Sequence, residues 1–191
     1  MIRSLFLILA LAAGWSAQAQ TEKRIIPKSQ QQAAEQRKTD KRLEEIQDSI
    51  DYAKAVQALE NLEFVVEADQ LVFKRGQSAF VSSSTNFISM HDAKAGVRGA
   101  PFNGGGPNGV GGVTVEGRAS DIKLKTDKRG NTYFTMNVLG NGISAMVTIS
   151  MAKGSNRASV TVNPNFNSNR ITLNGILIPA EESRVFKGRA F

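Results

Sequence analysis

Hydrophobic positions follow two different periods along the chain. Between residues 29 and 62 there is no glycine or proline, and the larger apolar residues recur every three or four positions. Such spacing places them on one side of a helix. They are Leu43, Ile46, Ile50, Ala53, Val56 and Leu59. We therefore predict a packed amphipathic helix that begins near Asp40 and lies across one end of the following domain or extends from it as an arm. A polar tether from residue 20 to about residue 40 precedes it.

After Leu62 the period changes to two, which is typical of strands with one buried face. The alternation is clearest from Ile143 to Met151, where every second residue is apolar. Glycine and asparagine in the short connections indicate tight hairpins. Many short strands joined in this way favour an antiparallel barrel or sandwich. The predicted strands are residues 63–67, 71–74, 78–82, 86–90, 93–99, 112–120, 121–126, 132–139, 143–151, 157–163, 170–174 and 176–179.

The N-terminus has the three parts of a secretory signal peptide. It reads MIRSLFLILALAAGWSAQAQ, with one arginine, a short apolar run and a small-x-small site at Ala17 and Ala19. The alternative, a retained membrane anchor, needs about 20 apolar residues in a row. We therefore expect a leader at residues 1–19, a tether and helix at 20–62 and a β domain at 63–191. The expected location is periplasmic or secreted after cleavage near Ala19, with no stable membrane span afterwards.

Composition argues against most enzyme chemistry. The chain has no cysteine, which excludes disulfides, thiol nucleophiles and thiolate metal sites. Its one histidine, His91, precedes Asp92 directly, and neighbours in sequence do not orient each other as a catalytic triad requires. Glu116, Asp121 and Asp127 are acids near one another, but such groups occur in any β domain. We expect no enzymatic activity, no cofactor and no metal site.

Basic residues outnumber acidic ones, giving a formal net charge of +7. A candidate anion-binding patch is formed by Lys123, Lys125, Lys128 and Arg129, where both ammonium groups of the first pair leave one face of a strand. The alternative is a solvated hairpin whose edge is protected by lysine. Export argues against nucleic acid as a partner. The possible partners that remain are an anionic glycan, lipid head groups or an acidic envelope protein. The alternative is that the basic surface only keeps the protein soluble.

The glycine-rich stretch FNGGGPNGVGG at residues 102–112 contains the letters of a dinucleotide fingerprint. A strand pattern follows it where that motif requires a helix, so we interpret it as a long loop between strands. Long loops often carry function, and this one could act as a lid over a barrel mouth. The candidate ligand-binding residues are Phe102, Pro107 and Asn108 of the loop, together with Tyr133.

Several blocks of the sequence closely resemble one protein family, domain of unknown function 4251, found in exported proteins of Bacteroides-type Gram-negative bacteria. The resemblance covers about residues 52–191 and implies an N-terminal helical segment followed by an antiparallel, lipocalin-like β-barrel. It implies no activity and no binding residue. Residues 94–105 depart from the regular alternating strand usual in the family, which weakens the prediction of a strand at 93–99. The blocks are ALENLEFVVEADQLVFKRGQ (58–77), TNFISM (85–90), GPNGVGGVTVEG (106–117), LKTDKRGNTYFTMNV (124–138), GISAMVTIS (142–150), KGSNRASVTVNPNFNSNRITLNGILIP (153–179) and SRVFKGR (183–189).

Three hypotheses about function follow. In the first, an exported, non-enzymatic envelope protein holds a small apolar or amphipathic ligand inside its barrel, where small inward residues such as Ala145 and Gly117 make room. In the second, the barrel is filled, and a structural or interaction protein docks to an envelope partner through its helix or its basic hairpin. An extracytoplasmic hydrolase is the third. A filled interior would remove the first hypothesis.

Overall fold

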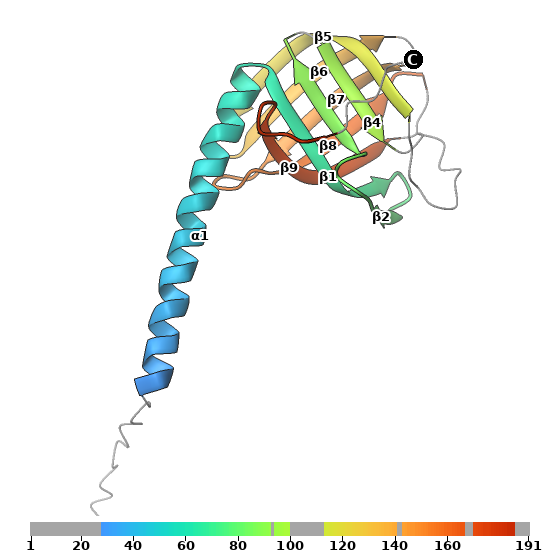
Figure 1. Cartoon of the computed structure of the whole chain (residues 1–191). Helices are drawn as coiled ribbons and strands as arrows, with labels where there is room; N and C mark the ends of the chain where they lie inside the picture. The colour runs from blue at the N-terminus through green and yellow to red at the C-terminus, as the bar shows by residue number, and fades with distance from the viewer. Residues whose placement is uncertain (1–27, 93, 100–112, 141–142, 167–169, 186–191) are drawn as a thin grey trace, which may run out of the picture. The chain divides into compact units, whose positions relative to one another are not determined.

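The structure, a computed structural model, describes residues 28–92, 94–99, 113–140, 143–166 and 170–185 (Figure 1). One helix precedes nine strands in this part of the chain. These elements are α1 (Lys28–Glu60), β1 (Glu63–Phe73), β2 (Ser78–Phe80), β3 (Phe87–His91), β4 (Lys94–Gly99), β5 (Val113–Thr126), β6 (Thr132–Gly140), β7 (Ile143–Met151), β8 (Arg157–Pro164) and β9 (Ile171–Pro179).

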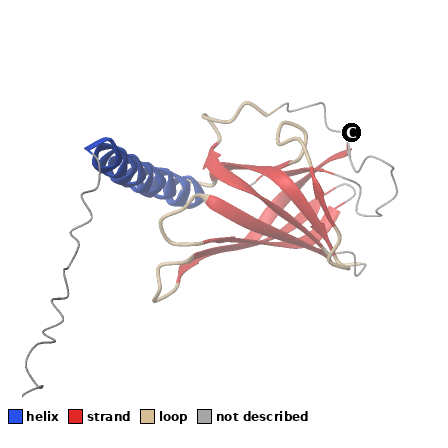
Figure 2. Ribbon diagram, turned by 90° about the horizontal axis from the view of Figure 1, so that it is seen from below, coloured by secondary structure: helices blue, strands red, loops and turns tan. Residues whose placement is uncertain are grey.

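The strands form an antiparallel barrel. Each strand from β3 to β9 pairs with the next, and β1 pairs with both β3 and β9, which closes the sheet (Figure 2). Strand β2 lies outside the ring and pairs with the second half of β1. The prediction of a mainly β fold with an N-terminal helix and a closed barrel is therefore confirmed, and the sandwich alternative is not. Strand β4 forms at Lys94–Gly99 despite its departure from the family pattern.

Three pairs of predicted strands are single continuous strands. The predicted breaks in β1 and β5 coincide with register shifts, between Ala68 and Gln70 and between Ser120 and Lys123. An extra residue at such a bulge reverses which face the following side chains point to, so the alternation breaks although the strand continues. In β9 the predicted break falls at Gly175. A Cβ atom there would collide with the carbonyl of Glu67 and lie 2.7 Å from the Cα of Ala68.

The helix begins earlier than the sequence indicated. It starts at Lys28 rather than near Asp40, so the second part of the predicted tether is helical. Residues 29–39 contain glutamine, alanine, glutamate, arginine and lysine, which have high helix propensity, and no glycine or proline interrupts them. Propensity is thus sufficient to continue the helix where apolar spacing is missing.

The last turns of α1 are anchored to the barrel. Ala55, Ala58 and Leu59 are buried in the same apolar cluster as the inward side chains of the strands. The hydroxyl of Tyr52 lies 2.9 Å from both the carbonyl oxygen of Gly130 and the hydroxyl of Thr132.

A charged contact adds to this anchor. Lys54 donates a hydrogen bond of 2.7 Å to Glu182, in the segment that follows β9. The hydrogen bond and the charge of Glu182 raise the pKa of Lys54. Apolar packing, a hydroxyl pair and an ion pair therefore all hold residues 52–59 of the helix to the barrel.

We expect Tyr52→Phe to lower the free energy of unfolding by about 1–2 kcal/mol, because the Thr132 hydroxyl loses a partner in a buried position. The measurement is urea unfolding followed by circular dichroism. Tyr133→Phe is the matched control, because its side chain is 42% exposed and surface changes of this kind stay within about 0.5 kcal/mol. Equal effects of the two substitutions would show that the Tyr52 hydroxyl does not anchor the helix.

Candidate functional site

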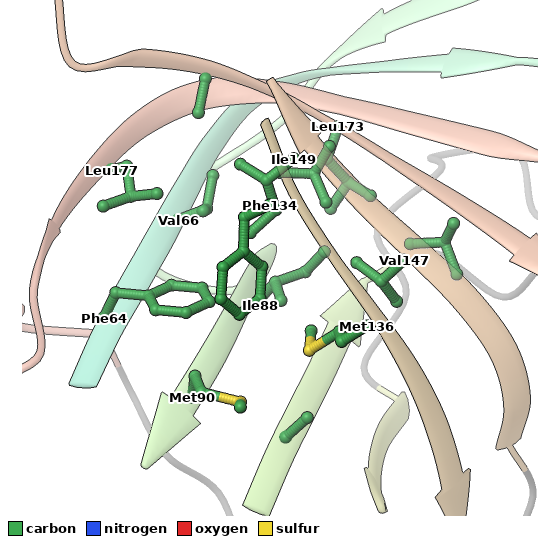
Figure 3. Close-up of a cluster of buried hydrophobic side chains, with 14 of the residues drawn as sticks. Phe64, Val66, Ile88, Met90, Phe134, Met136, Val147, Ile149, Leu173 and Leu177 are labelled. Atoms are coloured by element: carbon green, nitrogen blue, oxygen red, sulfur yellow. The ribbon is translucent and has the colours of Figure 1, made fainter. Parts of the chain in front are cut away.

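The described part of the barrel interior is filled by apolar side chains (Figure 3). Phe64 and Phe134 meet edge to face, with ring centroids 5.4 Å apart and planes inclined at 78°. Around them, inward side chains from several strands are completely buried. These include Val66, Ile88, Met90, Met136 and Val147.

The small inward residues do not leave a cavity. Ala145 is 1% exposed and belongs to the same apolar cluster. A Cβ atom on Gly117 would lie 2.7 Å from Cγ1 of Val138 and 2.9 Å from the carbonyl oxygen of Leu139, so neighbouring atoms already occupy that space. The expectation that Ala145 and Gly117 make room for a ligand is therefore wrong.

Of the candidate ligand-binding residues, the structure describes Tyr133 alone. Phe102, Pro107 and Asn108 lie outside the described residues. Tyr133 lies on β6 between the buried Thr132 and Phe134, and its own side chain is on the outer face. It points away from the interior that the first hypothesis requires.

The candidate basic patch lies on the outer face of β5 and in the turn after it. Lys123 and Lys125 are exposed, whereas Ile122 and Leu124 between them pack against the core, as the alternation predicted. Lys128 and Arg129 are exposed in the turn to β6.

Pairing of β5 with β6 brings two separate predictions together. Lys125 is directly opposite Tyr133, and Lys123 is opposite Thr135. Residues paired in this way share one face of the sheet. Tyr133, predicted for a pocket, therefore lies beside the basic patch on the outside of the barrel.

The turn that carries Lys128 and Arg129 has a fixed shape. Asp127 accepts hydrogen bonds of 2.8–2.9 Å from the backbone N–H of Arg129 and from the backbone and side-chain N–H groups of Asn131. Gly130 has φ of +87°, which favours glycine. The hydrogen bonds from Asn131, followed by that from Arg129, lower the pKa of Asp127.

The candidate catalytic groups stay dispersed. His91 Nδ1 lies 3.4 Å from a carboxylate oxygen of Glu63, on an exposed part of the β1–β3 ladder. Asp121 accepts a hydrogen bond from Asn137, and Asp127 is used by the turn. In the ranges that the structure covers, no three histidine or acidic side chains are placed to hold a metal ion. Nor is any helix there long and apolar enough to cross a membrane.

The apolar stripe of the helix is only partly packed, which sequence reasoning missed. Leu43, Ile46 and Ile50 are 60%, 51% and 47% exposed, whereas Leu59 is 1% exposed. The predicted run does not stay on one face, because at 3.6 residues per turn Leu59 lies about 180° around the helix from Ile50. Ala55, Ala58 and Leu59 face the barrel, whereas Ala53, a member of the predicted run, is exposed. We call Leu43, Ile46 and Ile50 the exposed stripe.

The charge of Asp127 predicts a pH-dependent stability. Because its folded pKa is lowered, the carboxylate stabilises the fold fully above the unfolded pKa of about 3.9, and this contribution is lost as the pH falls through the lower folded value. Wild type should therefore have a higher Tm than Asp127→Asn at pH 7 and pH 5, and the difference should shrink at pH 3. A Tm difference that stays constant over this range would contradict the role of the charge.

Comparison with known proteins gives a family but no activity. The family model described as "Domain of unknown function (DUF4251)" matches residues 47–177, from the anchored end of α1 to β9. The chain is also similar to the crystal structure of a DUF4251 family protein from Bacteroides eggerthii. The two are 48% identical with a TM-score of 0.66, and the match covers 77% of this chain and 99% of the other. No curated protein matches. This chain belongs to the DUF4251 family.

Proposed function

We propose that this protein is an exported, non-enzymatic interaction protein of the cell envelope, whose filled barrel supports a helix that docks to a protein partner. The observation that carries this proposal is the exposed stripe. Three large apolar side chains lie on one face of a helix whose next turns are anchored to the barrel through the other side of the helix. Apolar side chains gathered on one exposed face are typical of interaction sites, while single ones are common on any surface.

The filled interior supports an outer binding surface. The side chains around Phe64 and Phe134 leave no space for a small apolar ligand in the described part of the barrel. In this part of the barrel, the first hypothesis therefore has no cavity to rest on. Binding is left to the outer face of the strands and to the helix.

The anchored end of the helix favours binding through the stripe. Tyr52, Lys54 and Leu59 fix the segment that directly follows Ile50 in the same helix. A partner would meet side chains that are already in helical order, so little conformational entropy is lost on binding. Arg42, a charged residue beside the stripe, would provide part of a polar rim around an apolar centre.

The ionisable groups support a non-enzymatic role. The pKa of Lys54 is raised and that of Asp127 is lowered. Both shifts come mainly from hydrogen bonds at the surface, to Glu182 and to Asn131. Catalytic groups are more often perturbed by burial inside a cleft.

The stripe is tested by replacing it with glutamine, which keeps helix propensity while removing apolar surface. Leu43→Gln/Ile46→Gln/Ile50→Gln should fold normally but reduce recovery of the partner at least about tenfold, as for truncated interface hot spots. The measurement is quantitative mass spectrometry of proteins bound to the tagged chain in its own envelope. Lys41→Gln/Glu45→Gln/Asp48→Gln changes the opposite face and should leave recovery unchanged. A partner that stays bound to the stripe variant would overturn this assignment.

Export is tested at the small-x-small site. The mature chain should begin at Gln20 and be found in the periplasm or medium, as shown by fractionation and mass spectrometry of the N-terminus. Ala17→Glu should accumulate uncleaved precursor, because the cleavage site requires a small residue there. Gln18→Glu adds the same charge at the tolerant central position and should be processed normally. Wild-type chain that begins at Met1 in the cytoplasm would contradict export.

A further inference from the structure

We propose that the outer face of β5, β6 and β7 binds a polysaccharide that carries carboxylate groups. Two rows of side chains cross these three strands. Lys123, Thr135 and Thr148 form one row, and Lys125, Tyr133 and Ser150 form the other. We call these six residues the outer grid. It is separate from the exposed stripe and goes beyond the proposed function.

The outer grid follows from strand pairing. Neighbouring strands lie about 4.8 Å apart, and successive outward residues along a strand are about 7 Å apart. Hydroxyl and ammonium groups therefore recur at spacings comparable to the length of one sugar ring. All six side chains are at least partly exposed, and Tyr133 is 42% exposed.

The chemistry of the outer grid matches an acidic sugar chain. Serine and threonine hydroxyls both donate and accept hydrogen bonds, which suits sugar hydroxyls. The ring of Tyr133 offers an apolar face to the C–H side of a sugar. Lys123 and Lys125 provide charge-assisted bonds to carboxylates, and among the described residues neither forms an ion pair within the protein.

Within the outer grid, the positive charge that would select an anionic ligand comes from Lys123 and Lys125. The described outward side chains of β6 and β7 are all uncharged, and the carboxylate of Asp121 on β5 accepts a hydrogen bond from Asn137 beside them. These outward side chains are Tyr133, Thr135, Asn137, Leu139, Ser144, Met146, Thr148 and Ser150. Lys128 and Arg129, in the turn fixed by Asp127, add positive charge at one end of the outer grid.

The rows of polar side chains continue from β7 onto β8 and β9. This favours a polysaccharide chain over a small anion as the ligand. Thr148 pairs with Thr161 on β8, and Thr161 pairs with Thr172 on β9, with their hydroxyl oxygens 3.3 Å apart. Threonine has a restricted χ1 angle, so these hydroxyls are ordered before binding. A phosphate ion or a lipid head group would use the lysines alone and leave these rows without a role.

The test is binding of polygalacturonate to the whole mature protein by isothermal titration calorimetry. Fully methyl-esterified polygalacturonate has the same sugar backbone without the charge and should bind at least about tenfold more weakly, because hydrogen bonds to charged groups are the strongest. Tyr133→Ala should also weaken binding about tenfold, whereas Tyr133→Phe keeps the ring and should bind like wild type.

A matched pair of double variants separates a site from general attraction. Lys123→Ser/Lys125→Ser and Lys38→Ser/Lys41→Ser remove the same charge, the second from α1. Only the first should weaken binding, by about tenfold or more. Equal losses in both variants, equal binding of the methyl ester, or unchanged binding by Tyr133→Ala would each overturn the proposal. Thermal unfolding of each variant confirms that it is folded.

Discussion

Pairing of β1 with β9 is the contact on which the rest of the structure depends. It joins the first long strand to the last and turns an open sheet into a closed one. The pairing passes through the bulge near Ala68, and Gly175 lies opposite, where the backbone of Glu67 approaches too closely for any side chain. Closure removes free strand edges, and it gives every strand an inner face and an outer face.

Once the sheet is closed, the inner face is used for stability. The inward side chains are large enough to meet at the centre, as the contact between Phe64 and Phe134 shows. The end of α1 adds Leu59 to the same cluster. A small barrel can hold a ligand only when its side chains leave space, and here they do not in the described part. The fold resembles a container, but its packing is that of an ordinary core.

The outer face and the helix are therefore the two surfaces at which we propose recognition. Tyr52 and Lys54 fix the helix end, and the exposed stripe continues from it. On the outer face of the barrel, Lys125 of β5 lies directly opposite Tyr133 of β6. One surface is apolar and suits a protein partner, while the other is polar and basic and suits an acidic glycan. A stable barrel can carry both because neither contributes to its core.

The sequence by itself determined the class of fold and the position of most strands. Period-two alternation placed the strands, and it placed Lys123 and Lys125 outside with Ile122 and Leu124 inside, because alternation depends only on neighbours in sequence. Tertiary structure decided the features that depend on long-range contacts. It decided that Leu59 is covered while Leu43 is not, since burial depends on which side of the helix meets the barrel. It also decided that the described part of the interior is filled and that Tyr133 lies beside Lys125, because volume and cross-strand register are set only when distant strands pair.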